Sequence, residues 1–527
     1  MSNEYGGSKF MRQKLAELKA ERERVIHLAS PKAVERQHSR GKMTARERIN
    51  FFYDPGSFVE LGLFSKPRIT GFDIDQQDLT GDGVITGYGN VQGRPAYAYA
   101  QDFTIAGGSQ GSVHGKKTLR VMKQALKARV PCIHMIDSGG VRIQDAVSRD
   151  FNDSYSLYFY YHTISSGVIP QIGLLMGPCA AGAAYSPILT DFLIMVKGTS
   201  HMYIASPTLI KSVQFVDVTE EEIGGAQMHA EVSGCCDVLA ENDEDCLQKC
   251  QELLSFLPSH NQQEPPIVPT GDDPHRRDEE LLDVVPVDSK KWYDMHRVIQ
   301  HIVDKGRFFP IKPDFAKNMI TGFARLDGRS IGIVANNPKH KAGAIDINAA
   351  DKEARFIRFC DCFNIPLLFL VDNPAYLPGV DQERGGIIRH GAKVLHAISE
   401  ATVPKFTVYI RKAYGGGNPA MCNEPLGADL LLAWPTTEMG LMNPDGAVNI
   451  IYRNEIAAAE NPEEVRARRL AEYKASFGRF PYHAAQMRWV EEIIDPRDTR
   501  PLLIQALKTF LHKTDERPWK KHGNIPL

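Results

Sequence analysis

The sequence of 527 residues lacks the features that mark several classes of protein. No apolar run reaches the roughly 18 residues of a membrane-spanning helix, so no membrane contact by this chain is predicted. The net charge of −2 gives no general field for nucleic acid, which is therefore not expected as a partner. The N-terminus is polar and charged, unlike a secretory signal, and this predicts a cytoplasmic protein, or a mitochondrial matrix protein in a eukaryote.

Cysteine is present but follows no regular pattern. The nine cysteines form no CxxC pair, and their odd number does not fit a framework of disulfides. A structural zinc ribbon is not expected, no other metal site is indicated, and most of the thiols are predicted to be buried. The apolar content of 43% and charged content of 24% are ordinary for a soluble globular protein.

The strongest positive feature is an internal repeat. Residues 131–140 and 366–375 both contain a proline, an apolar run, an aspartate and a turn, and Asp137 and Asp372 lie 235 positions apart. The same offset, or 234 further along, relates several other pairs: Ile85-Thr-Gly87 with Ile320-Thr-Gly322, Gly93 with Gly328, Lys117 with Lys352, Pro170 with Pro404, and Gly182 with Gly416. A period this long indicates duplication of a whole domain rather than a solenoid. We predict an N-terminal domain over residues 1–257, a Pro-rich linker over 258–290 and a homologous C-terminal domain over 291–527.

Each half alternates strands with helices, which predicts the α/β class. Helices are expected over residues 8–28, from a Thr44/Glu47 capping box, and over 115–128, 350–363, 462–477 and 500–512. Strands are expected within 83–104, 319–335 and 366–371. The basic residues around 40–49 form either a solvated face or a contact with an anionic ligand. The tail from Arg517 to Leu527 is predicted to dock on the surface, because it carries a tryptophan and apolar residues.

Two short motifs have ordinary explanations. The segment Gly107-Gly-Ser-Gln-Gly111 fits the G-x-S-x-G pattern of a hydrolase nucleophile, but the corresponding place in the second half has no serine. A glycine turn is therefore favoured. The segment Val121-Met-Lys-Gln124 resembles the surroundings of a biotinylated lysine, yet it lies within a predicted helix, so Lys123 is interpreted as a surface residue.

Runs of very small residues occur at repeat-equivalent positions after matching strands. They are Gly177–Pro187 and Arg411–Ala420, and each half adds a second backbone cluster, Ser138–Val141 and Pro374–Tyr376. Small side chains let a ligand oxygen approach backbone N–H groups. Two converging N–H groups form an oxyanion hole, so the sequence predicts one hole in each half. This suits a reaction between two carbonyl compounds that both pass through enolates.

Longer motifs identify a family resemblance that covers about residues 41–527. They are Gly81-Asp-Gly-Val84, Ser138-Gly-Gly-Val-Arg-Ile-Gln144, Ser166-Gly-Val-Ile-Pro170, Gly385-Gly-Ile-Ile-Arg-His-Gly-Ala-Lys393, Lys412-Ala-Tyr-Gly-Gly416 and Asn524-Ile-Pro-Leu527. With them the chain resembles the biotin-dependent acyl-CoA carboxyltransferases, most closely the propionyl-CoA carboxylase β subunits. The resemblance implies two crotonase-like (ClpP/crotonase) domains and a homo-hexamer. The acyl-CoA would lie on the N-terminal domain, and carboxybiotin from a separate biotin carboxylase or biotin carrier subunit would enter against the C-terminal domain of a neighbouring subunit.

The resemblance also assigns residues. The thioester oxygen would meet the N–H groups of Val141, Gly182 and Ala183, and the biotin ureido oxygen those of Ala375, Tyr376, Gly416 and Gly417. Further contacts with substrate are expected from Gly139, Gly140, Ala181, Tyr185 and Pro419. No metal is implied, and the coenzyme A is part of the substrate.

The chain departs from the propionyl-type pattern at several of these positions. Val141 and Ala181 replace Ala and Gly, Ala375 replaces a Gly, and Pro419 stands where the family sets its acyl preference. The sequence therefore predicts transfer of a carboxyl group to a short or medium acyl-CoA without fixing the acyl group. Three alternatives stay open: a methylmalonyl-CoA-type decarboxylase α subunit or transcarboxylase subunit, a stand-alone crotonase-type hydratase, for which the expected pair of glutamates is not found, and a non-catalytic scaffold.

Overall fold

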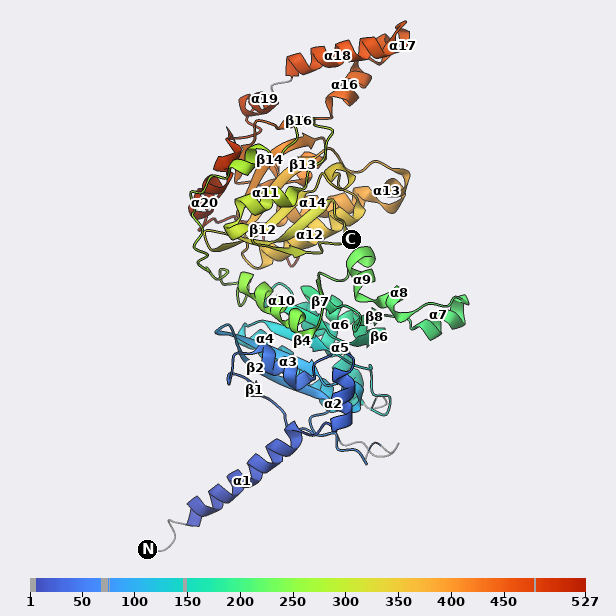
Figure 1. Ribbon diagram of the computed structural model, residues 1–527, viewed down its shortest axis with the longest axis vertical. Coiled ribbons are helices and arrows are strands. Elements are labelled where there is room, and N and C mark those ends of the chain that lie inside the picture. The colour runs from blue at the N-terminus through green and yellow to red at the C-terminus, as the bar shows by residue number, and fades with distance from the viewer. Residues whose placement is uncertain (1–5, 68–73, 75, 146–148, 478–479) are drawn as a thin grey trace. The chain divides into compact units, whose positions relative to one another are not determined.

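A computed structural model of the chain describes residues 6–67, 74, 76–145, 149–477 and 480–527. It divides into two compact units: Met1–Ser255 with Ser259–Asn261, and Phe256–Pro258 with Gln262–Leu527. Each unit is built on one mixed sheet flanked by helices (Figure 1), so the predicted α/β class is confirmed.

The sheet of unit 1 has seven strands in the order β1-β2-β3-β4-β5-β7-β9. The first three strands pair antiparallel, and the pairs from β3 to β9 are parallel. A second, two-stranded sheet pairs β6 with β8. The bounds are β1 Val59–Glu60, β2 Val84–Val91, β3 Arg94–Gln101, β4 Cys132–Ile136, β5 Gln171–Leu175, β6 Pro178–Ala180, β7 Phe192–Val196, β8 His201–Tyr203 and β9 Val238–Ala240.

The helices of unit 1 include α4 and α5, which pack on each other beside the parallel strands. Their buried side chains, with those of β4, form an apolar cluster around Val121, Met122 and Ile169. The bounds are α1 Gly6–Ile26, α2 Pro31–His38, α3 Ala45–Phe52, α4 Ser112–Ala128, α5 Arg149–Ser165, α6 Tyr185–Ile188, α7 Pro207–Gln214, α8 Glu220–Gly224, α9 Ala226–Met228 and α10 Asp243–Phe256.

Unit 2 repeats this plan with an eight-stranded sheet in the order β10-β11-β12-β13-β14-β15-β17, in which β16 also pairs with β14. Its strands are β10 Phe308–Ile311, β11 Met319–Leu326, β12 Arg329–Asn336, β13 Leu367–Asn373, β14 Lys405–Tyr414, β15 Leu430–Ala433, β16 Glu438–Gly440 and β17 Glu492–Ile493. Its helices are α11 Met295–Ile302, α12 Ile347–Cys362, α13 Val380–Gly385, α14 Ile387–Glu400, α15 Gly417–Ala420, α16 Pro444–Ile451, α17 Arg453–Ala458, α18 Pro462–Phe477, α19 Phe480–Gln486 and α20 Thr499–Thr509.

The two units share detailed backbone geometry at the positions related by the sequence repeat. Gly108 and Gly343 both have positive φ, at 62° and 81°. A Cβ atom on either would lie 2.4 or 2.5 Å from the carbonyl oxygen of Asp137 or Asp372. Only glycine fits such a close backbone approach. The turn before each long helix therefore packs against the end of the following parallel strand.

The aspartates at the ends of β4 and β13 are fully buried and paired. Asp137 accepts from Lys42 at 2.7 Å and Arg48 at 2.9 Å, and Asp372 accepts from Arg411 at 2.9 Å. The basic residues around 40–49 were expected to form either a solvated face or a contact with an anionic ligand. The solvated face is wrong for Lys42 and Arg48, which are buried and pair with Asp137 at the start of the loop that leads into a backbone cluster.

The predicted elements are largely confirmed, including the Thr44/Glu47 capping box and the helix Pro462–Phe477. The expectation for the C-terminal tail was only partly right. Arg389 does donate to the Leu527 carbonyl, at 3.3 Å, but the side chains of Trp519 and Leu527 are 86% and 82% exposed. The described tail is therefore held by polar contacts and not by burial of its tryptophan.

Candidate functional site

Val141 lies where the loop after β4 passes the turn before α4. The carbonyl of Gly140 accepts from Gln110 N–H at 2.9 Å, and Arg142 N–H donates to the Gln110 carbonyl at 2.9 Å. In such a parallel bridge the N–H of the middle residue points away from its partner strand. Within the described part of the chain the Val141 N–H meets no acceptor, so it is available to a ligand.

Gly182 supplies a second available N–H group in unit 1. It lies in the first turn of the 3₁₀ helix η2 (Ala181–Ala184), which follows directly on β6. The first N–H groups of a helix have no acceptor inside it, and the Gly182 N–H has none elsewhere in the described residues. Ala181, with φ of 57°, adopts a left-handed conformation that is strained for alanine. Ala183 belongs to the same turn, so the three residues present their backbone together.

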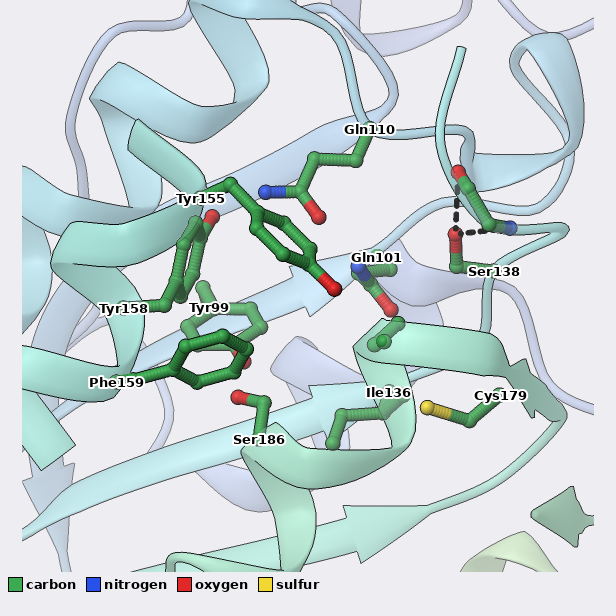
Figure 2. A pocket seen from close by; sticks show the side chains of 13 residues that line it. Tyr99, Gln101, Gln110, Ile136, Ser138, Tyr155, Tyr158, Phe159, Cys179 and Ser186 are labelled. Atoms are coloured by element: carbon green, nitrogen blue, oxygen red, sulfur yellow. Dashed lines mark hydrogen bonds between the residues drawn. The ribbon is translucent and has the colours of Figure 1, made fainter. Parts of the chain in front are cut away.

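A pocket (Figure 2) is lined by Gly182 and by Gly140, the residue before Val141. Its lining includes the predicted residues Gly140, Gly182 and Ala183, with Gln101, Gln110, Ile136, Ser138, Cys179 and Ser186, and an aromatic set of Tyr99, Tyr155, Tyr158 and Phe159. No acidic or basic side chain is among these described lining residues. The pocket can therefore hold an apolar group next to backbone donors, but it offers no charged acid or base.

The Tyr155 side chain points into the pocket (Figure 2), and its hydroxyl lies against Gly182. A Cβ atom on Gly182 would lie 1.4 Å from the Tyr155 hydroxyl oxygen, so only glycine leaves room for this arrangement. The Tyr155 ring packs edge-on against Phe159 at 5.2 Å between centroids. Burial raises the pKa of the Tyr155 hydroxyl, which is therefore neutral at physiological pH.

A buried chain of hydrogen bonds lies behind the pocket. Gln171 Nε2 donates to the His162 carbonyl at 3.0 Å, which leaves Gln171 Oε1 facing His162 Nδ1 at 2.9 Å. Because an amide oxygen only accepts, Nδ1 carries the ring proton, and His162 Nε2 accepts from the Ser186 hydroxyl at 2.7 Å. Burial lowers the pKa of His162 to about 4, so this assignment holds at neutral pH.

The second backbone cluster, in unit 2, repeats the geometry of the first. The Ile345 N–H donates to the Ala375 carbonyl at 3.1 Å and Leu377 N–H to the Ile345 carbonyl at 2.8 Å, so Tyr376 takes the place of Val141. Its N–H likewise meets no acceptor among the described residues. The N–H of Ala375, in contrast, donates to Asn373 Oδ1 at 3.0 Å. The Ala375 N–H is therefore not a free donor in this structure, contrary to the expectation from the sequence, because the Asn373 side chain closes a turn over it.

Gly415, Gly416 and Gly417 correspond to Ala181, Gly182 and Ala183. Gly415 has the left-handed φ of 53° that Ala181 also adopts, and Gly416 and Gly417 open α15. Neither Gly416 N–H nor Gly417 N–H reaches an acceptor in the described residues. Asn373 Nδ2 donates to the Gly417 carbonyl at 3.2 Å, so one side chain ties this turn to the Tyr376 loop.

The other residues that were predicted to contact the substrate are less well placed to do so. The N–H groups of Gly139 and Gly140 are used internally, by the Gly107 carbonyl at 2.9 Å and the Ser138 hydroxyl at 3.0 Å. Tyr185 is 54% exposed and stacks edge-on against Phe159, outside the pocket lining. Pro419 is partly buried in α15.

The discounted motifs are structural. Ser109 Oγ accepts from Arg142 Nε at 3.2 Å and the turn around it has positive φ at Gly107, as expected of a glycine turn. The Lys123 ammonium lies over the Tyr161 ring, 5.0 Å from its centroid, within α4. A search of the described residues found neither three grouped metal-ligating side chains nor a helix long and apolar enough to cross a membrane.

Sequence reasoning missed Tyr155, Ser186 and His162. The spacing of Tyr155, Tyr158 and Phe159 places all three on one face of a helix, which could have indicated an aromatic wall. The link between Ser186 and His162 had no such signal, because the two residues are 24 positions apart and meet only through the fold.

Comparison with known proteins gives extensive similarity. The carboxyl transferase domain family matches residues 36–525. The methylmalonyl-CoA decarboxylase subunit alpha of Veillonella parvula is 50% identical over 98% of this chain and 98% of its own. The carboxyltransferase subunit of propionyl-CoA carboxylase from Haloferax mediterranei is 48% identical over 98% of this chain and 100% of its own. The crystal structure of transcarboxylase 12S, described as a hexamer with methylmalonyl-coenzyme A and methylmalonic acid bound, matches with a TM-score of 0.94 and 48% identity, over 98% of each chain.

Proposed function

The chain belongs to the carboxyl transferase domain family, and on this premise we propose that it is the carboxyltransferase subunit of a biotin-dependent acyl-CoA carboxylase. Its reaction moves a carboxyl group from carboxybiotin to the α-carbon of a short or medium acyl-CoA. The resemblance inferred from the sequence and its crotonase-like fold are confirmed by the same similarities.

One observation carries the assignment of the site: each unit presents available backbone N–H groups on repeat-equivalent loops. Val141 and Gly182 correspond to Tyr376 and Gly416, and all four N–H groups lack acceptors among the described residues. Orphaned donors on two rigid, duplicated turns are what a pair of oxyanion holes requires. A purely structural role would leave the duplication of the free donors unexplained.

In unit 1 the N–H groups of Val141 and Gly182 hold the thioester oxygen of the acyl-CoA. They stabilise the negative charge that develops on this oxygen when the α-proton leaves, at about 3–4 kcal/mol for one donor. The resulting thioester enolate attacks CO2 through its α-carbon. The uncharged pocket suits this chemistry, because a dry site strengthens each N–H contact with the enolate oxygen.

In unit 2 the N–H groups of Tyr376, Gly416 and Gly417 would hold the ureido oxygen of biotin. The residues fit such a group: a Cβ atom on Gly416 would lie 3.6 Å from the Tyr376 ring, so the approach to the donors is open. Carboxybiotin supplies the activated carboxyl group and, after its release, the base that takes the α-proton. The acyl-CoA side is therefore assigned to the N-terminal domain and the carboxybiotin side to the C-terminal domain.

The assembly and location follow from the same proposal. Biotin arrives on a separate biotin carboxylase or biotin carrier subunit, and six copies of this chain form a homo-hexamer, as described for transcarboxylase 12S. In this arrangement the acyl-CoA side of one subunit works with the carboxybiotin side of a neighbour. The enzyme acts in the cytoplasm, or in the mitochondrial matrix of a eukaryote.

A second candidate is supported by relatives of similar identity. The chain matches a methylmalonyl-CoA decarboxylase alpha subunit at 50% and the 12S subunit of methylmalonyl-CoA carboxyltransferase from Propionibacterium freudenreichii at 49%. In both, the transfer step would run in reverse, from the carboxylated acyl-CoA to biotin. The identity of the biotin-bearing partner distinguishes the carboxylase from these alternatives, since a carboxylase needs an ATP-dependent biotin carboxylase and a decarboxylase does not.

The first experiment is streptavidin capture from a native lysate, followed by mass spectrometry of the proteins that elute with this chain. We expect a biotinylated partner that contains a biotin carboxylase. The reconstituted complex should then fix labelled bicarbonate only when ATP and an acyl-CoA are both present. A partner without a biotin carboxylase would favour the decarboxylase or transcarboxylase.

Gly416→Trp tests the two-hole mechanism itself. The indole would cover the unit 2 donors, so carboxyl transfer should be lost, while acyl-CoA binding to unit 1 is retained in calorimetry. A stand-alone hydratase would keep its activity in this variant. A folded Gly416→Trp protein that still transfers carboxyl groups would refute the assignment of unit 2.

A further inference from the structure

The pocket beside Gly140 and Gly182 is small and has an aromatic wall. Its volume is only about 40 Å³, and a single water needs roughly 10–15 Å³ measured in the same way. Tyr99, Tyr155, Tyr158 and Phe159 line one side of this space (Figure 2). An acyl group whose thioester oxygen meets the two N–H groups therefore has room for only a few heavy atoms beyond the carbonyl carbon.

Tyr155 sets one wall of this space. Its hydroxyl lies against the Gly182 backbone and its ring is held by Phe159, with 5.2 Å between centroids. Phe159 is in turn packed edge-on against Tyr185 at 6.2 Å. Because the aromatic rings support each other, an acyl chain can lengthen here only if Tyr155 moves.

Ser186 makes the end of the pocket polar as well as narrow. Its hydroxyl proton is donated to His162 Nε2, and the Gln171 amide fixes that ring in one tautomer. The Tyr99 hydroxyl also hydrogen-bonds the Ser186 side chain, so the serine is held between two buried partners and offers no donor to the pocket. An alkyl end that displaced Ser186 would break one of these bonds and leave a buried polar group without a partner, which is unfavourable.

We propose that Tyr155 and the His162-bound Ser186 select the acyl group, and that they restrict the enzyme to acyl-CoA substrates of up to about four carbons. The inference rests on the proposed carboxyltransferase function and names the substrate class of its unit 1 site. It adds a determinant in unit 1 to Pro419, the position expected from the sequence to set acyl preference. One methylene in an apolar pocket changes discrimination by about 10- to 200-fold, so two residues suffice for strong selection.

The test uses the full chain in complex with its biotin-bearing partner. Carboxylation rates and calorimetric affinities are measured for acetyl-, propionyl-, butyryl- and hexanoyl-CoA. For the wild type, hexanoyl-CoA should have a kcat/KM at least about 100-fold below that of the best short substrate. Tyr155→Ala should raise the hexanoyl/propionyl ratio at least about 10-fold, and Ser186→Leu should reduce butyryl-CoA more than acetyl-CoA.

Tyr160→Ala is the matched control, because Tyr160 lies on the same helix but is 56% exposed and outside the pocket lining. It should leave the chain-length profile unchanged. If Tyr155→Ala fails to fold, Ser186→Leu decides the question alone, since it narrows the pocket from the opposite side.

The outcomes separate this inference from the function on which it rests. Efficient use of hexanoyl-CoA by the wild type, or an unchanged ratio in folded Tyr155→Ala and Ser186→Leu variants, would overturn the inference while transfer persists. Absence of transfer to every CoA ester, with a length-dependent affinity that Tyr155→Ala relaxes, would reject the proposed function and support the pocket assignment.

Discussion

At the scale of single residues, the site depends on two glycines that have no side chain. Gly182 and Gly416 occupy equivalent turns, but their surroundings differ. A Cβ atom on Gly182 would overlap the Tyr155 hydroxyl, at 1.4 Å, whereas one on Gly416 would meet the Tyr376 ring at an ordinary 3.6 Å. Replacement by alanine should therefore impair transfer much more at Gly182 than at Gly416.

Gly182→Ala should lower kcat/KM for carboxylation by about 100-fold, because displacing Tyr155 moves the acyl group relative to its two N–H donors. Gly416→Ala should retain transfer within a few-fold of the wild type. Steady-state kinetics of both variants with one acyl-CoA checks the contrast. The double variant Gly182→Ala/Tyr155→Ala should recover part of the loss, and a loss that is simply additive would show that the clash is not the cause.

The repeat indicated which loops carry the site, and the family resemblance named the residues on them. Val141, Gly182, Tyr376 and Gly416 were among these residues, and the N–H group of each has no acceptor among the described residues. Ala375 could not be judged in this way, because its N–H is taken by the Asn373 side chain at 3.0 Å. Whether a donor is free depends on a side-chain rotamer, which residue spacing does not determine.

At the scale of elements, equivalent lysines in the two units each link a helix to the start of a strand through hydrogen bonds to backbone carbonyls. Lys352, on α12, donates to the carbonyls of Lys312, Phe315 and Met319 at 2.6–2.8 Å. Lys117, on α4, donates to those of Gly81 and Val84 at 2.8 and 2.6 Å. The repeat indicated that the two lysines are equivalent, but their burial was not foreseen, because lysine is rarely buried.

Lys352→Met should destabilise unit 2 by about 2–4 kcal/mol, because three buried carbonyls lose their donor while the apolar part of the side chain is kept. Faster hydrogen exchange along β11, measured by mass spectrometry, is the expected sign. Lys317→Met is the control, since Lys317 is an exposed residue that forms a surface ion pair with Asp314, three positions earlier. Unchanged exchange along β11 in Lys352→Met would contradict the anchoring role.

Element boundaries were well predicted where local signals mark them. The capping box of α3 and the proline that opens α18 both lie where the sequence places them. The continuity of β14 could not be predicted in the same way. Its ten residues, Lys405–Tyr414, correspond to β5 and β6, which a break at Met176 and Gly177 separates in unit 1. A Cβ atom on Gly177 would lie 1.9 Å from Asp137 Oδ1, so a contact across the fold forces a glycine at this break.

At the scale of the whole molecule, the two units differ in their buried histidines. His114, His134 and His162 are all fully buried in unit 1, and none is fully buried among the described residues of unit 2. Burial lowers the pKa of His114 to about 3 and of His162 to about 4, and it lowers that of His134 as well. Unfolded unit 1 therefore binds more protons than folded unit 1 once the pH falls below about 6.5.

Acidification should consequently open unit 1 before unit 2. Stability falls as the pH decreases from 6.5 toward the folded pKa values, and three histidines together cost about 4 kcal/mol at pH 5.5. His229, whose pKa is raised despite its burial through contacts with Cys235 and the Met202 carbonyl, offsets part of this loss. Hydrogen exchange at pH 7 and 5.5 should show protection lost first along β4 and β5.

His134→Phe provides a sharper test of this cause. Neither ring nitrogen of His134 has a hydrogen-bond partner within the described residues, and the ring packs between Tyr99 and His162, at 5.0 and 4.8 Å between centroids. Phenylalanine fills this place without a group to protonate, so the variant should lose about 1.4 kcal/mol less stability than the wild type between pH 7 and 5.5. Equal acid sensitivity of variant and wild type would mean that another group controls the opening of unit 1.

Because the pocket, Val141 and Gly182 all belong to unit 1, acyl-CoA binding should weaken in the same pH range, while the backbone donors of unit 2 remain in place.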